Sequence, residues 1–428
     1  MKIAFVSQPF DNMTPPVRGG SLSMWIYYMA RICARRGHEV TVFGNHGSRL
    51  HSKKCRHDGV EYVFTRTLVD SGVNRLGRIA ENALRAIGMK RGTNLSTNAG
   101  WHHWGYAREV ARHIRNAKCD VVHIMGYSQF VPVIRRAYPD VRIALHMQCE
   151  WLTQFPRKVI EPRLRQVDLI IGCSEYITRL VADGFPEFAD KCVTVPNSAD
   201  VIPEGSAAVP AGEKVLFVGR ISPEKGIHDL ITAFHLVLER FPEASLHLVG
   251  AAGSAPIEYL VGLSDVPYVK DLSRFYERPP LANGKDPYLV TLEELAGPEL
   301  GRRITFEGRA DHDKISDHYR NAAVLVNPSL SESFGISLVE AMMLKKPVVA
   351  TRVGGMAHTV IPGETGLLVD PANPNALAEA ICKVLEDPAL ARQMGEAGRK
   401  RAVGHFSWER SADLLLEVYR ARPCHSEA

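Results

Sequence analysis

Several features that would assign a protein to a class at once are missing from this sequence. The eight cysteines form no CxxC pair, so neither a zinc site nor a disulfide framework is indicated, and a reducing cytoplasm is the simplest setting. No run of about 18 apolar residues occurs, which argues against a membrane-spanning helix. The chain opens on a short apolar run and continues with polar residues and prolines, which is typical of a first strand and not of a signal peptide.

What is present is an ordinary globular composition with unevenly spread charge. Of the 428 residues, 45% are hydrophobic and 23% are charged, and the length favours two domains. Residues 1–202 hold 28 Lys and Arg against 17 Asp and Glu, a net charge of +11, which leaves −6 for the rest of the chain. Such an excess either attracts an anionic substrate or an acidic membrane surface, or it is a solvated basic face. No nucleic-acid partner is predicted, because no motif that reads nucleic acid is recognisable.

Apolar β-rich runs alternate with helix-like stretches along the chain. In the first half, strands are predicted at 2–7, 39–44, 60–65, 120–125, 142–147, 168–174 and 191–196. In the second half, they are predicted at 214–219, 244–250, 303–308, 323–328, 346–351 and 365–370. Several are continuous Val, Ile and Leu runs, as expected of strands buried on both faces of a parallel sheet. The alternation predicts an α/β protein with two doubly wound Rossmann-like domains.

A segment rich in Pro, Gly and small residues, 203–213, is predicted to be the linker between these domains. We predict an N-terminal domain over 1–202, a C-terminal domain over 214–404 and a final helical segment over 405–428. Two such domains would face each other across a cleft, and open α/β sheets bind ligands at their carboxyl edges. A long stretch that interrupts the alternation, about 251–300, is predicted to be an insertion.

The segment NPSLSESFGISLVEAMMLKKPVVATRVGG, residues 327–355, is the most informative. A strand ends at its start, and Gly335 opens the next helix, where free N–H groups and the positive end of the helix dipole suit a phosphate. Glu332, at the mouth of that helix, and Glu340, inside it, offer carboxylates to sugar hydroxyls. The alternative for Glu332 is simple capping of the helix.

A second charged loop lies in LFVGRISPEKGIHDLITAF, residues 216–234. Arg220 and Lys225 follow a predicted strand, and two cations there can neutralise a diphosphate. Cations that are fixed in advance also stabilise the negative charge that develops when a diphosphate departs. The alternative is an exposed salt bridge to Glu224 or Asp229.

A third loop, between the first predicted strand and the first predicted helix, contains Gly19 and Gly20. It can lie against a phosphate or an acceptor, or it can be an ordinary turn. It lacks the G-x-G-x-x-G spacing of a dinucleotide-binding loop, so a nicotinamide enzyme is not indicated.

These segments, in this order, resemble the retaining nucleotide-sugar glycosyltransferases of the GT-B fold, specifically glycosyltransferase family 4 (glycosyl transferases group 1). The resemblance covers most of the chain. It includes E-x(7)-E from Glu332 to Glu340, VGR-xxx-EKG, VVAT-xx-GG, VPNSAD (195–200) and HFSWER (405–410). It implies a two-domain GT-B fold whose final helix crosses back to the N-terminal domain.

The resemblance assigns roles in catalysis and donor binding. Arg220 and Lys225 would hold the donor diphosphate, and Glu332 would contact hexose hydroxyls. His146, ending the predicted strand RIALH, would lie near the reacting face of the donor sugar, the alternative being a ring satisfied by backbone alone. Further donor contacts are implied at Gly19, Gly20, Arg309, Ser333, Phe334, Gly335 and Ile336, with Glu340 accepting from the ribose hydroxyls.

The same resemblance implies a reaction that retains the anomeric configuration and needs no metal ion or other cofactor. Departure and attack would take place on one face of the sugar, and the leaving phosphate oxygen would take the acceptor proton. Glu332 and Glu340 are not a glycosidase pair, because Glu340 would face the ribose. UDP is predicted as the donor nucleotide because it is the commonest in the family.

The acceptor side is expected in the N-terminal domain and is poorly specified by the sequence. Candidates are Arg18, the basic stretch 75–118, and the aromatic rings of Trp101, Trp104 and Trp151, which can stack on sugar faces. Basic residues there can meet a phosphate on a sugar-phosphate or lipid-linked acceptor, or the inner face of a membrane. A solvated helix face would explain the same cations.

We therefore predict a cytoplasmic hexosyltransferase, with peripheral membrane contact as a further prediction. Its acceptor would be a hydroxyl of a sugar, a glycan, a lipid-linked compound or a small molecule. Two alternatives remain: a nucleotide-sugar 2-epimerase of the same architecture, which needs no acceptor, and a catalytically silent sugar-nucleotide-binding protein. The intact charged residues favour an enzyme.

Overall fold

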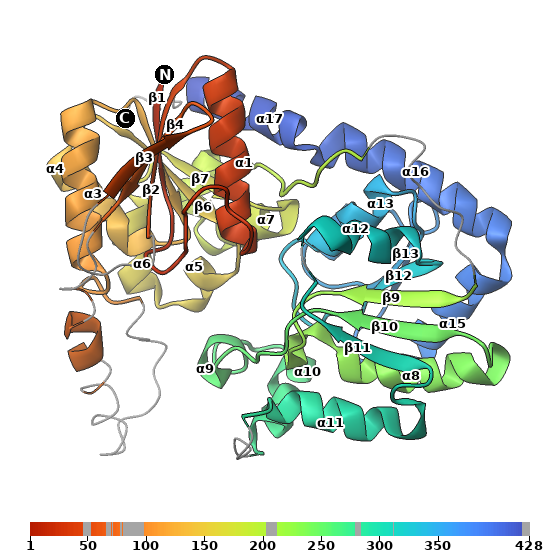
Figure 1. Cartoon of the computed structure of the whole chain (residues 1–428). Coiled ribbons are helices and arrows are strands. Elements are labelled where there is room, and N and C mark those ends of the chain that lie inside the picture. Colours follow the sequence, from red (N-terminus) through yellow and green to blue (C-terminus); the bar gives the residue numbers. More distant parts are fainter. Residues whose placement is uncertain are drawn as a thin grey trace. The chain divides into compact units, whose positions relative to one another are not determined.

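A computed structural model of the chain describes residues 1–45, 53–65, 70, 72–77, 79, 98–202, 212–278, 284–310 and 312–421. The chain divides into two compact units (Figure 1). Unit 1 comprises Met1–Pro196 together with the chain from Ser411 onward, and unit 2 comprises Asn197–Arg410. Most of the predicted linker, 203–211, lies outside the described residues, so the predicted domain boundaries stay a prediction.

Unit 1 is built on a sheet that has eight strands among the described residues, in the order β3-β4-β2-β1-β5-β6-β7-β8. All neighbours are parallel except β3, which is antiparallel to β4. The strands are β1 Lys2–Val6, β2 Glu39–Gly44, β3 Lys53–His57, β4 Val60–Phe64, β5 Val121–Met125, β6 Arg142–Met147, β7 Leu169–Gly172 and β8 Cys192–Thr194. The strands predicted in the first half are thereby confirmed. The sequence pattern missed β3 because KKCRH is a polar edge strand without apolar alternation.

Helices follow most of these strands, as the alternation predicts. They are α1 Ser21–Arg35, α3 Trp104–Ala117, α4 Val131–Ala137, α5 Trp151–Gln154, α6 Arg157–Leu164 and α7 Glu175–Gly184, with short 3₁₀ turns η2 Ser128–Phe130 and η3 Pro186–Lys191. The strand β5 is buried along its whole length, as expected of a central parallel strand that is covered on both faces.

The last helix, α17 (Trp408–Arg420), completes unit 1 with its residues from Ser411 onward. Ser411 Oγ donates a hydrogen bond to the Pro196 carbonyl at 3.0 Å. Arg142 Nη1 donates to the Tyr419 carbonyl at 3.1 Å. The predicted return of the final helix to the N-terminal domain is therefore seen in its contacts.

Unit 2 is built on a parallel sheet in the order β11-β10-β9-β12-β13-β14, with six strands among the described residues. The strands are β9 Lys214–Val218, β10 Ser245–Val249, β11 Ile304–Gly308, β12 Val324–Asn327, β13 Val348–Thr351 and β14 Leu367–Val369. The helices are α8 Ile227–Arg240, α9 Ile257–Leu260, α10 Pro267–Lys270, α11 Pro287–Ala296, α12 His312–Arg320, α13 Ile336–Met343, α14 Met356–Thr359, α15 Pro374–Glu386 and α16 Pro388–Phe406, with η4 Pro223–Lys225, η5 Asp271–Tyr276 and η6 Gly297–Glu299. Each predicted strand of the second half is present.

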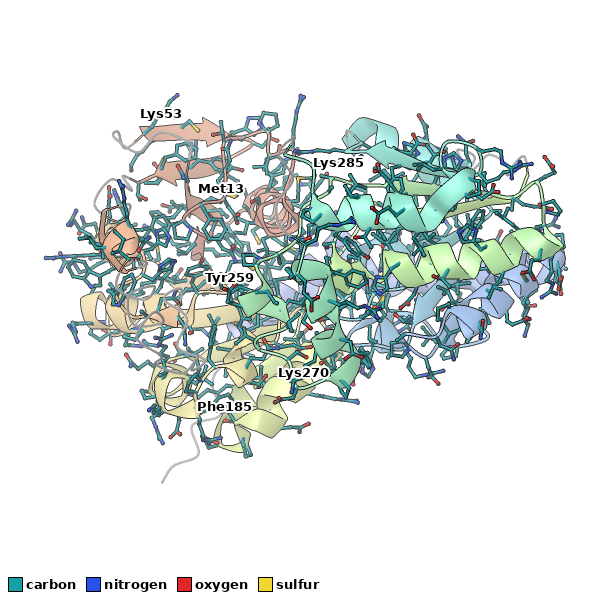
Figure 2. The ribbon with its side chains drawn as sticks, turned by 90° about the horizontal axis from the view of Figure 1, so that it is seen from below. Met13, Lys53, Phe185, Tyr259, Lys270 and Lys285 are labelled. Atoms are coloured by element: carbon teal, nitrogen blue, oxygen red, sulfur yellow. The ribbon has the colours of Figure 1, made fainter. Side chains whose placement is uncertain are left out.

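The stretch at 251–300 forms the short elements α9, α10, η5, α11 and η6, and Figure 2 labels Tyr259 and Lys270 on it. Val269 and Leu272 from this stretch are buried in a small apolar cluster with Leu330. Leu330 belongs to the loop that follows β12. The insertion therefore packs directly on a loop at the carboxyl edge of the unit 2 sheet.

Candidate active site

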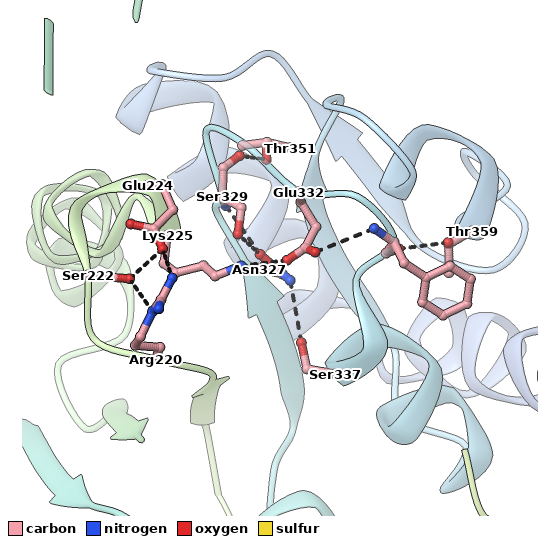
Figure 3. Close-up of polar contacts among 11 residues, drawn as sticks. Arg220, Ser222, Glu224, Lys225, Asn327, Ser329, Glu332, Ser337, Thr351 and Thr359 are labelled. Carbon is pink, nitrogen blue, oxygen red and sulfur yellow. Dashed lines mark hydrogen bonds and ion pairs between the residues drawn. The ribbon is translucent and has the colours of Figure 1, made fainter. Parts of the chain in front are cut away.

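The predicted donor residues come together at the carboxyl edge of the unit 2 sheet. The strand order reverses between β9 and β12, which are hydrogen-bonded neighbours, and such a switch point is where open α/β sheets bind ligands. The loop after β9 carries Arg220 and Lys225, and the loop after β12 carries Glu332 (Figure 3). Because the two strands end side by side, residues 107 positions apart in the chain make direct contact.

Arg220 is held in place by a buried carboxylate. Its Nη2 donates to Glu224 Oε1 at 2.6 Å, and its Nε donates to Ser222 Oγ at 3.2 Å. Ser222 Oγ in turn donates to Glu224 Oε1 at 2.7 Å. The Arg220 side chain is 50% exposed, while that of Glu224 is 5% exposed. The ion pair considered from the sequence is thus present, and it orients a half-exposed guanidinium that can still receive an anion.

Lys225 and Glu332 form the central ion pair of the site. Lys225 Nζ donates to Glu332 Oε2 at 2.7 Å, and the two side chains are 20% and 18% exposed. The Phe334 N–H donates to Glu332 Oε1 at 3.4 Å. Burial raises the pKa of Glu332, but the Lys225 charge and the N–H groups of Phe334 and Gly335 outweigh it, so the pKa lies below its ordinary value. Glu332 is therefore an anion at neutral pH. Its backbone donors, Phe334 and Gly335, precede the first residue of α13, and the N-cap position is Gly335, so capping of the helix by Glu332 is not seen.

The two loops are joined along their backbones as well. The Leu330 N–H donates to the Glu224 carbonyl at 2.8 Å. Gly226 has φ of +64°, and a Cβ there would lie 2.1 Å from the Pro328 carbonyl oxygen, so only glycine allows this close approach. Gly335, with φ of +87°, opens α13. These contacts fix the cations and carboxylates relative to one another before any ligand arrives.

Buried polar side chains anchor the loop after β12 by hydrogen bonds (Figure 3). Asn327 Oδ1 accepts from Ser329 Oγ at 2.6 Å, and the Ser329 carbonyl accepts from Thr351 Oγ1. On the far side of the loop, Thr359 Oγ1 donates to the Phe334 carbonyl at 2.9 Å. The turn that carries Glu332 is therefore anchored at both ends.

Glu340 lies inside α13, where the sequence predicts it, and it has a partner that the sequence pattern did not reveal. Tyr319, on α12, is buried and donates its hydroxyl hydrogen to Glu340 Oε2. Burial and then the Glu340 charge raise the pKa of Tyr319 well above its ordinary value, so the hydroxyl remains a donor. Arg309 lies exposed just after β11, and the side chains of Ser333 and Ile336 are half-buried. The structure thus brings the predicted donor residues of unit 2 to one edge.

In unit 1, the predicted glycines lie at the start of α1. Arg18, Gly19 and Gly20 are exposed, and Gly20, with φ of +80°, is the residue that precedes the helix. No charged partner of these residues is recorded among the described residues. Their predicted phosphate or acceptor contact stays a prediction.

His146 is fully buried in unit 1, at the end of β6. Its Nδ1 lies 3.1 Å from His123 Nε2, and its Nε2 lies 3.0 Å from the side-chain nitrogen of Gln148. Burial lowers its pKa to about 3. Both ring nitrogens are therefore engaged by side chains, where the sequence alternative considered backbone partners, and a direct contact with a sugar stays a prediction.

The carboxyl edge of the unit 1 sheet contains a small pocket, lined by residues that include Asn98, Tyr127, Ser128, Met147, Trp151 and Phe155. Among the predicted acceptor residues, Trp151 lines this pocket. Trp101 and Trp104 are exposed, and the Arg108 guanidinium lies 5.0 Å from the centre of the Trp104 ring.

Arg163, which the sequence analysis passed over, lies beneath this pocket. Its side chain is buried, and it donates to Asn98 Oδ1 at 2.7 Å, to the Asn98 carbonyl at 2.7 Å and to Ser128 Oγ at 3.1 Å. Burial lowers its pKa to about 10, so it stays charged at neutral pH. Among the described residues, no carboxylate pairs with it. Buried arginines are normally paired, so an unpaired one beside a pocket is a candidate anion-binding residue.

Within the described residues, no group of three or more His, Cys, Asp and Glu side chains is arranged to hold a metal ion. The chain does carry one Asp-x-Asp triplet, at 311–313, and the positions of those side chains lie outside the described part of the structure. In the described residues, none of the helices has the length and apolarity needed to cross a bilayer.

Comparisons with known families match nearly the whole chain. Residues 22–201 match the family model described as Glycosyltransferase Family 4, and residues 200–401 match the one described as Glycosyl transferases group 1. A D-inositol 3-phosphate glycosyltransferase of Arthrobacter sp. is 35% identical over 61% of this chain and 59% of the relative. Spore coat protein SA of Bacillus subtilis is 24% identical over 98% of this chain and 99% of that protein. The matches to the first three curated relatives span about half of each relative's length, from 46% to 59%.

Solved structures of the same fold cover both units. The trehalose-phosphate synthase of Burkholderia xenovorans in complex with glucose-6-phosphate aligns with a TM-score of 0.68 and 16% identity, over 98% of this chain and 100% of that one. The Anabaena protein HepE in complex with UDP and glucose aligns with a TM-score of 0.62 and 19% identity, over 97% of this chain and 98% of that one. Identities at this level establish the fold.

Proposed function

Because the chain belongs to glycosyltransferase family 4, among the group 1 glycosyl transferases of the GT-B fold, we propose that it transfers a hexose from a UDP-linked sugar to a hydroxyl acceptor. The observation that carries this proposal is the joined pair of loops in unit 2. They present two cations, Arg220 and Lys225, beside the Glu332 carboxylate at the switch point of a parallel sheet.

In this proposal, the diphosphate lies on Arg220 and Lys225. Arg220 can offer two N–H groups to the phosphate oxygens, and Lys225 supplies a point charge. Glu332 accepts hydrogen bonds from the hexose hydroxyls, and Glu340 accepts from the ribose hydroxyls. The proposed UDP donor is supported by the UDP that HepE binds in its solved structure.

The proposed transfer retains the anomeric configuration. The bond from the anomeric carbon to the phosphate oxygen breaks, and its electron pair stays on that oxygen. The acceptor oxygen bonds to the same face of the carbon, and its proton passes to the departing phosphate. Arg220 and Lys225 stabilise the charge that builds up on the diphosphate, which lowers the barrier because they are already in place. We propose that no metal ion is needed for this step.

We propose that the acceptor is a phosphorylated compound with free hydroxyls, bound by unit 1. The support is the buried, unpaired guanidinium of Arg163 beneath the pocket that Trp151 lines. Relatives named for D-inositol 3-phosphate, and a solved structure that holds glucose-6-phosphate, point to the same class. The proposed setting is the cytoplasm, which is consistent with seven described cysteines that form no disulfide bond with one another. Peripheral membrane contact through the basic half stays a separate prediction.

Product analysis tests this function directly. Purified protein is incubated with UDP-glucose, with and without glucose 6-phosphate, and the products are separated and their anomeric configuration is read by proton NMR. The proposal expects UDP together with an α-linked product that forms only when the acceptor is present. An epimerised UDP-sugar formed without acceptor would identify a 2-epimerase. Tight UDP-sugar binding without turnover would identify a silent binding protein.

A further inference from the structure

The turn that carries Glu332 is contacted by a helix that lies more than fifty residues further along the chain. That helix, α16, ends at Phe406, whose ring meets the ring of Phe334 edge-on, with centroids 5.5 Å apart and an interplanar angle of 86°. Both rings are buried. The Phe334 N–H group in turn donates to Glu332 Oε1 at 3.4 Å. The end of α16 therefore packs directly against the residue whose backbone contacts the Glu332 carboxylate.

A second route from α16 reaches the same turn through the short helix α14. Arg401, on α16, donates from Nε to the Thr359 carbonyl at 2.9 Å and from Nη2 to the His358 carbonyl at 2.6 Å. These carbonyls lie at the C-terminal end of α14, where a helix supplies no donors of its own. Thr359 Oγ1 lies 2.9 Å from the Phe334 carbonyl, closer than the 3.1 Å to its acceptor within α14, the Gly355 carbonyl (Figure 3). Arg401 therefore fixes the residue that anchors Phe334.

The opposite end of α14 contacts the turn through its backbone. The Gly355 N–H donates to the Glu332 carbonyl at 3.0 Å. A Cβ at Gly355 would lie 2.1 Å from the Ser333 carbonyl oxygen, so no side chain fits between α14 and the turn. Both the backbone and the carboxylate of Glu332 thus depend on neighbours that α16 holds in place.

Arg401 and Phe406 also contact each other. The guanidinium carbon of Arg401 lies 5.4 Å from the centre of the Phe406 ring, which is within the range of a cation–π interaction. Arg401 is half-buried, and burial lowers its pKa, but a guanidinium stays charged at neutral pH. It is therefore a permanent donor to the end of α14. We call Arg401, Phe406 and Thr359 the Phe334 clamp.

We propose that Arg401 and Phe406 are positioning residues for the hexose end of the donor site. A hydrogen bond weakens steeply when its geometry deviates, so a carboxylate that recognises sugar hydroxyls must be held in a fixed place. This inference rests on the proposed function, in which Glu332 accepts from the hexose hydroxyls. Arg220 is oriented by Glu224 within its own loop. The clamp should therefore matter more for the hexose than for the nucleotide.

Binding measurements separate this role from a general role in folding. Isothermal titration calorimetry on the full-length protein gives the Kd for UDP and for UDP-glucose. Arg401→Met should raise the Kd for UDP-glucose about tenfold more than the Kd for UDP, as expected for one lost hydrogen bond. Arg401→Lys should recover most of this affinity, since an ammonium group also donates to carbonyls. Equal losses for the two ligands, or no loss for either, overturn the proposal.

Two further variants complete the binding experiment. Lys400→Met, at an exposed position on the same helix, is the matched control and should bind both ligands like the unaltered protein. Phe406→Leu keeps the position apolar and removes the edge-on ring contact, so it should show the same selective loss for UDP-glucose. It also keeps the proposal testable if Arg401→Met fails to fold.

A double-mutant cycle tests the positioning role without any ligand. If the clamp holds Glu332 beside Lys225, the loss of unfolding free energy that Lys225→Met causes should fall to about half in a Phe406→Leu background. In a Lys400→Met background, this loss should be unchanged. The same loss in all three backgrounds overturns the proposal. If the unaltered protein binds UDP-glucose no more tightly than UDP, the proposed hexose contact of Glu332 fails, and the cycle alone decides the positioning role.

Discussion

The two sheet edges use opposite electrostatic designs. At the edge of unit 2, cations are paired with carboxylates of the protein: Arg220 with Glu224, and Lys225 with Glu332. At the edge of unit 1, Arg163 is buried, and its hydrogen-bond partners are neutral groups of Asn98 and Ser128.

This difference shows how each edge meets an anion. Under the proposed function, a diphosphate in unit 2 would share Lys225 with Glu332, and the donor sugar would satisfy the carboxylate with its hydroxyls. In unit 1, an anion at Arg163 would be the first negative charge that the guanidinium meets. In this proposal, a ligand at unit 2 replaces part of the Lys225–Glu332 contact, whereas a ligand at unit 1 supplies the negative charge that Arg163 does not receive from the described residues.

The largest effect is expected from substitution of Glu332, at the carboxyl edge of the unit 2 sheet. Glu332→Gln should lower kcat/KM for UDP-glucose by about 100-fold or more, because an amide accepts weaker hydrogen bonds from the hexose and no longer pairs with Lys225. Initial rates of UDP formation measure this. Glu379→Gln, an exposed carboxylate that pairs with Arg240 in the same unit, is the control and should keep full activity. Activity of Glu332→Gln at the parent level would contradict the assignment of the site.

The Lys225–Glu332 ion pair can also be broken by substituting Lys225. Lys225→Met should lower the free energy of unfolding at pH 7 by about 2 kcal/mol, because a partly buried carboxylate loses its charged hydrogen-bond donor. The Glu332 pKa lies below its unfolded value of 4.5, so its stabilising effect is fully present above pH 4.5 and is lost as the pH falls through the folded value. The gap between the two proteins should therefore narrow with acidification.

Urea unfolding at pH 7, 5 and 4 measures that gap. Lys270→Met, which breaks an exposed pair with Asp265, is the matched control and should change stability by less than about 1 kcal/mol at each pH. A gap that stays constant with pH would mean that the ion pair does not contribute as described.

At the carboxyl edge of unit 1, substitution of Arg163 should change only the kinetics that depend on the acceptor. Arg163→Met should reduce transfer to glucose 6-phosphate by about tenfold or more, because the phosphate loses its charged donor, and should leave UDP-glucose hydrolysis unchanged. Arg165→Met is a close control, since Arg165 is exposed two residues away and pairs with Glu161. Equal losses of transfer and hydrolysis would indicate that Arg163 only supports the fold, which the melting temperature would then confirm.

A smaller effect is expected from substitution of Tyr319, the hydrogen-bond partner of Glu340 in unit 2. Tyr319→Phe removes the hydrogen bond that orients Glu340, so the KM for UDP-glucose should rise roughly threefold to tenfold. Discrimination against 2′-deoxy-UDP-glucose should shrink at the same time. Tyr288→Phe, which removes a buried hydroxyl bonded to His228 in the same unit, is the control. Unchanged discrimination would show that Glu340 does not recognise the ribose.

The smallest expected effect is that of metal removal. Arg220 and Lys225 are proposed to stabilise the charge on the departing diphosphate, which a metal ion does in other enzymes. EDTA should therefore leave the transfer rate unchanged, and added Mg²⁺ should not raise it. Loss of activity in EDTA that Mg²⁺ restores would contradict this, and would direct attention to the Asp-x-Asp triplet at 311–313.

The fold was largely predictable from the sequence because its strands are continuous apolar runs that need burial on both faces. The exception, β3, is a charged edge strand whose place comes from pairing with β4 and not from its own composition. The unit 2 site was predictable for a related reason: its cations and carboxylates occur within two short loops. The Arg220–Glu224 pair was considered from the sequence, because it lies within one loop, whereas the Lys225–Glu332 pair followed only from the adjacency of β9 and β12.

The unit 1 site could not be predicted in the same way. Arg163 lies in EPRLRQ, where nothing in the sequence distinguishes it from the exposed Arg165, and only the three-dimensional structure shows its burial against Asn98. Tyr419 Oη lies 2.6 Å from His123 Nδ1 although the two residues are 296 positions apart, so no local pattern connects them. The sequence identified His146, but not the two neighbours that determine its hydrogen bonding.

The helix α17 has a consequence for the order in which the protein is made. The strands of unit 1 precede unit 2 along the chain, whereas the helix α17, which carries Tyr419, follows unit 2. During synthesis, the strands of unit 1 must therefore wait, with the His123 side chain lacking its Tyr419 partner, until unit 2 and α17 have also been synthesised. Fragments that end at the boundary after Pro196 will lack α17. Expression of unit 1 by itself will therefore require that α17 is supplied together with Met1–Pro196.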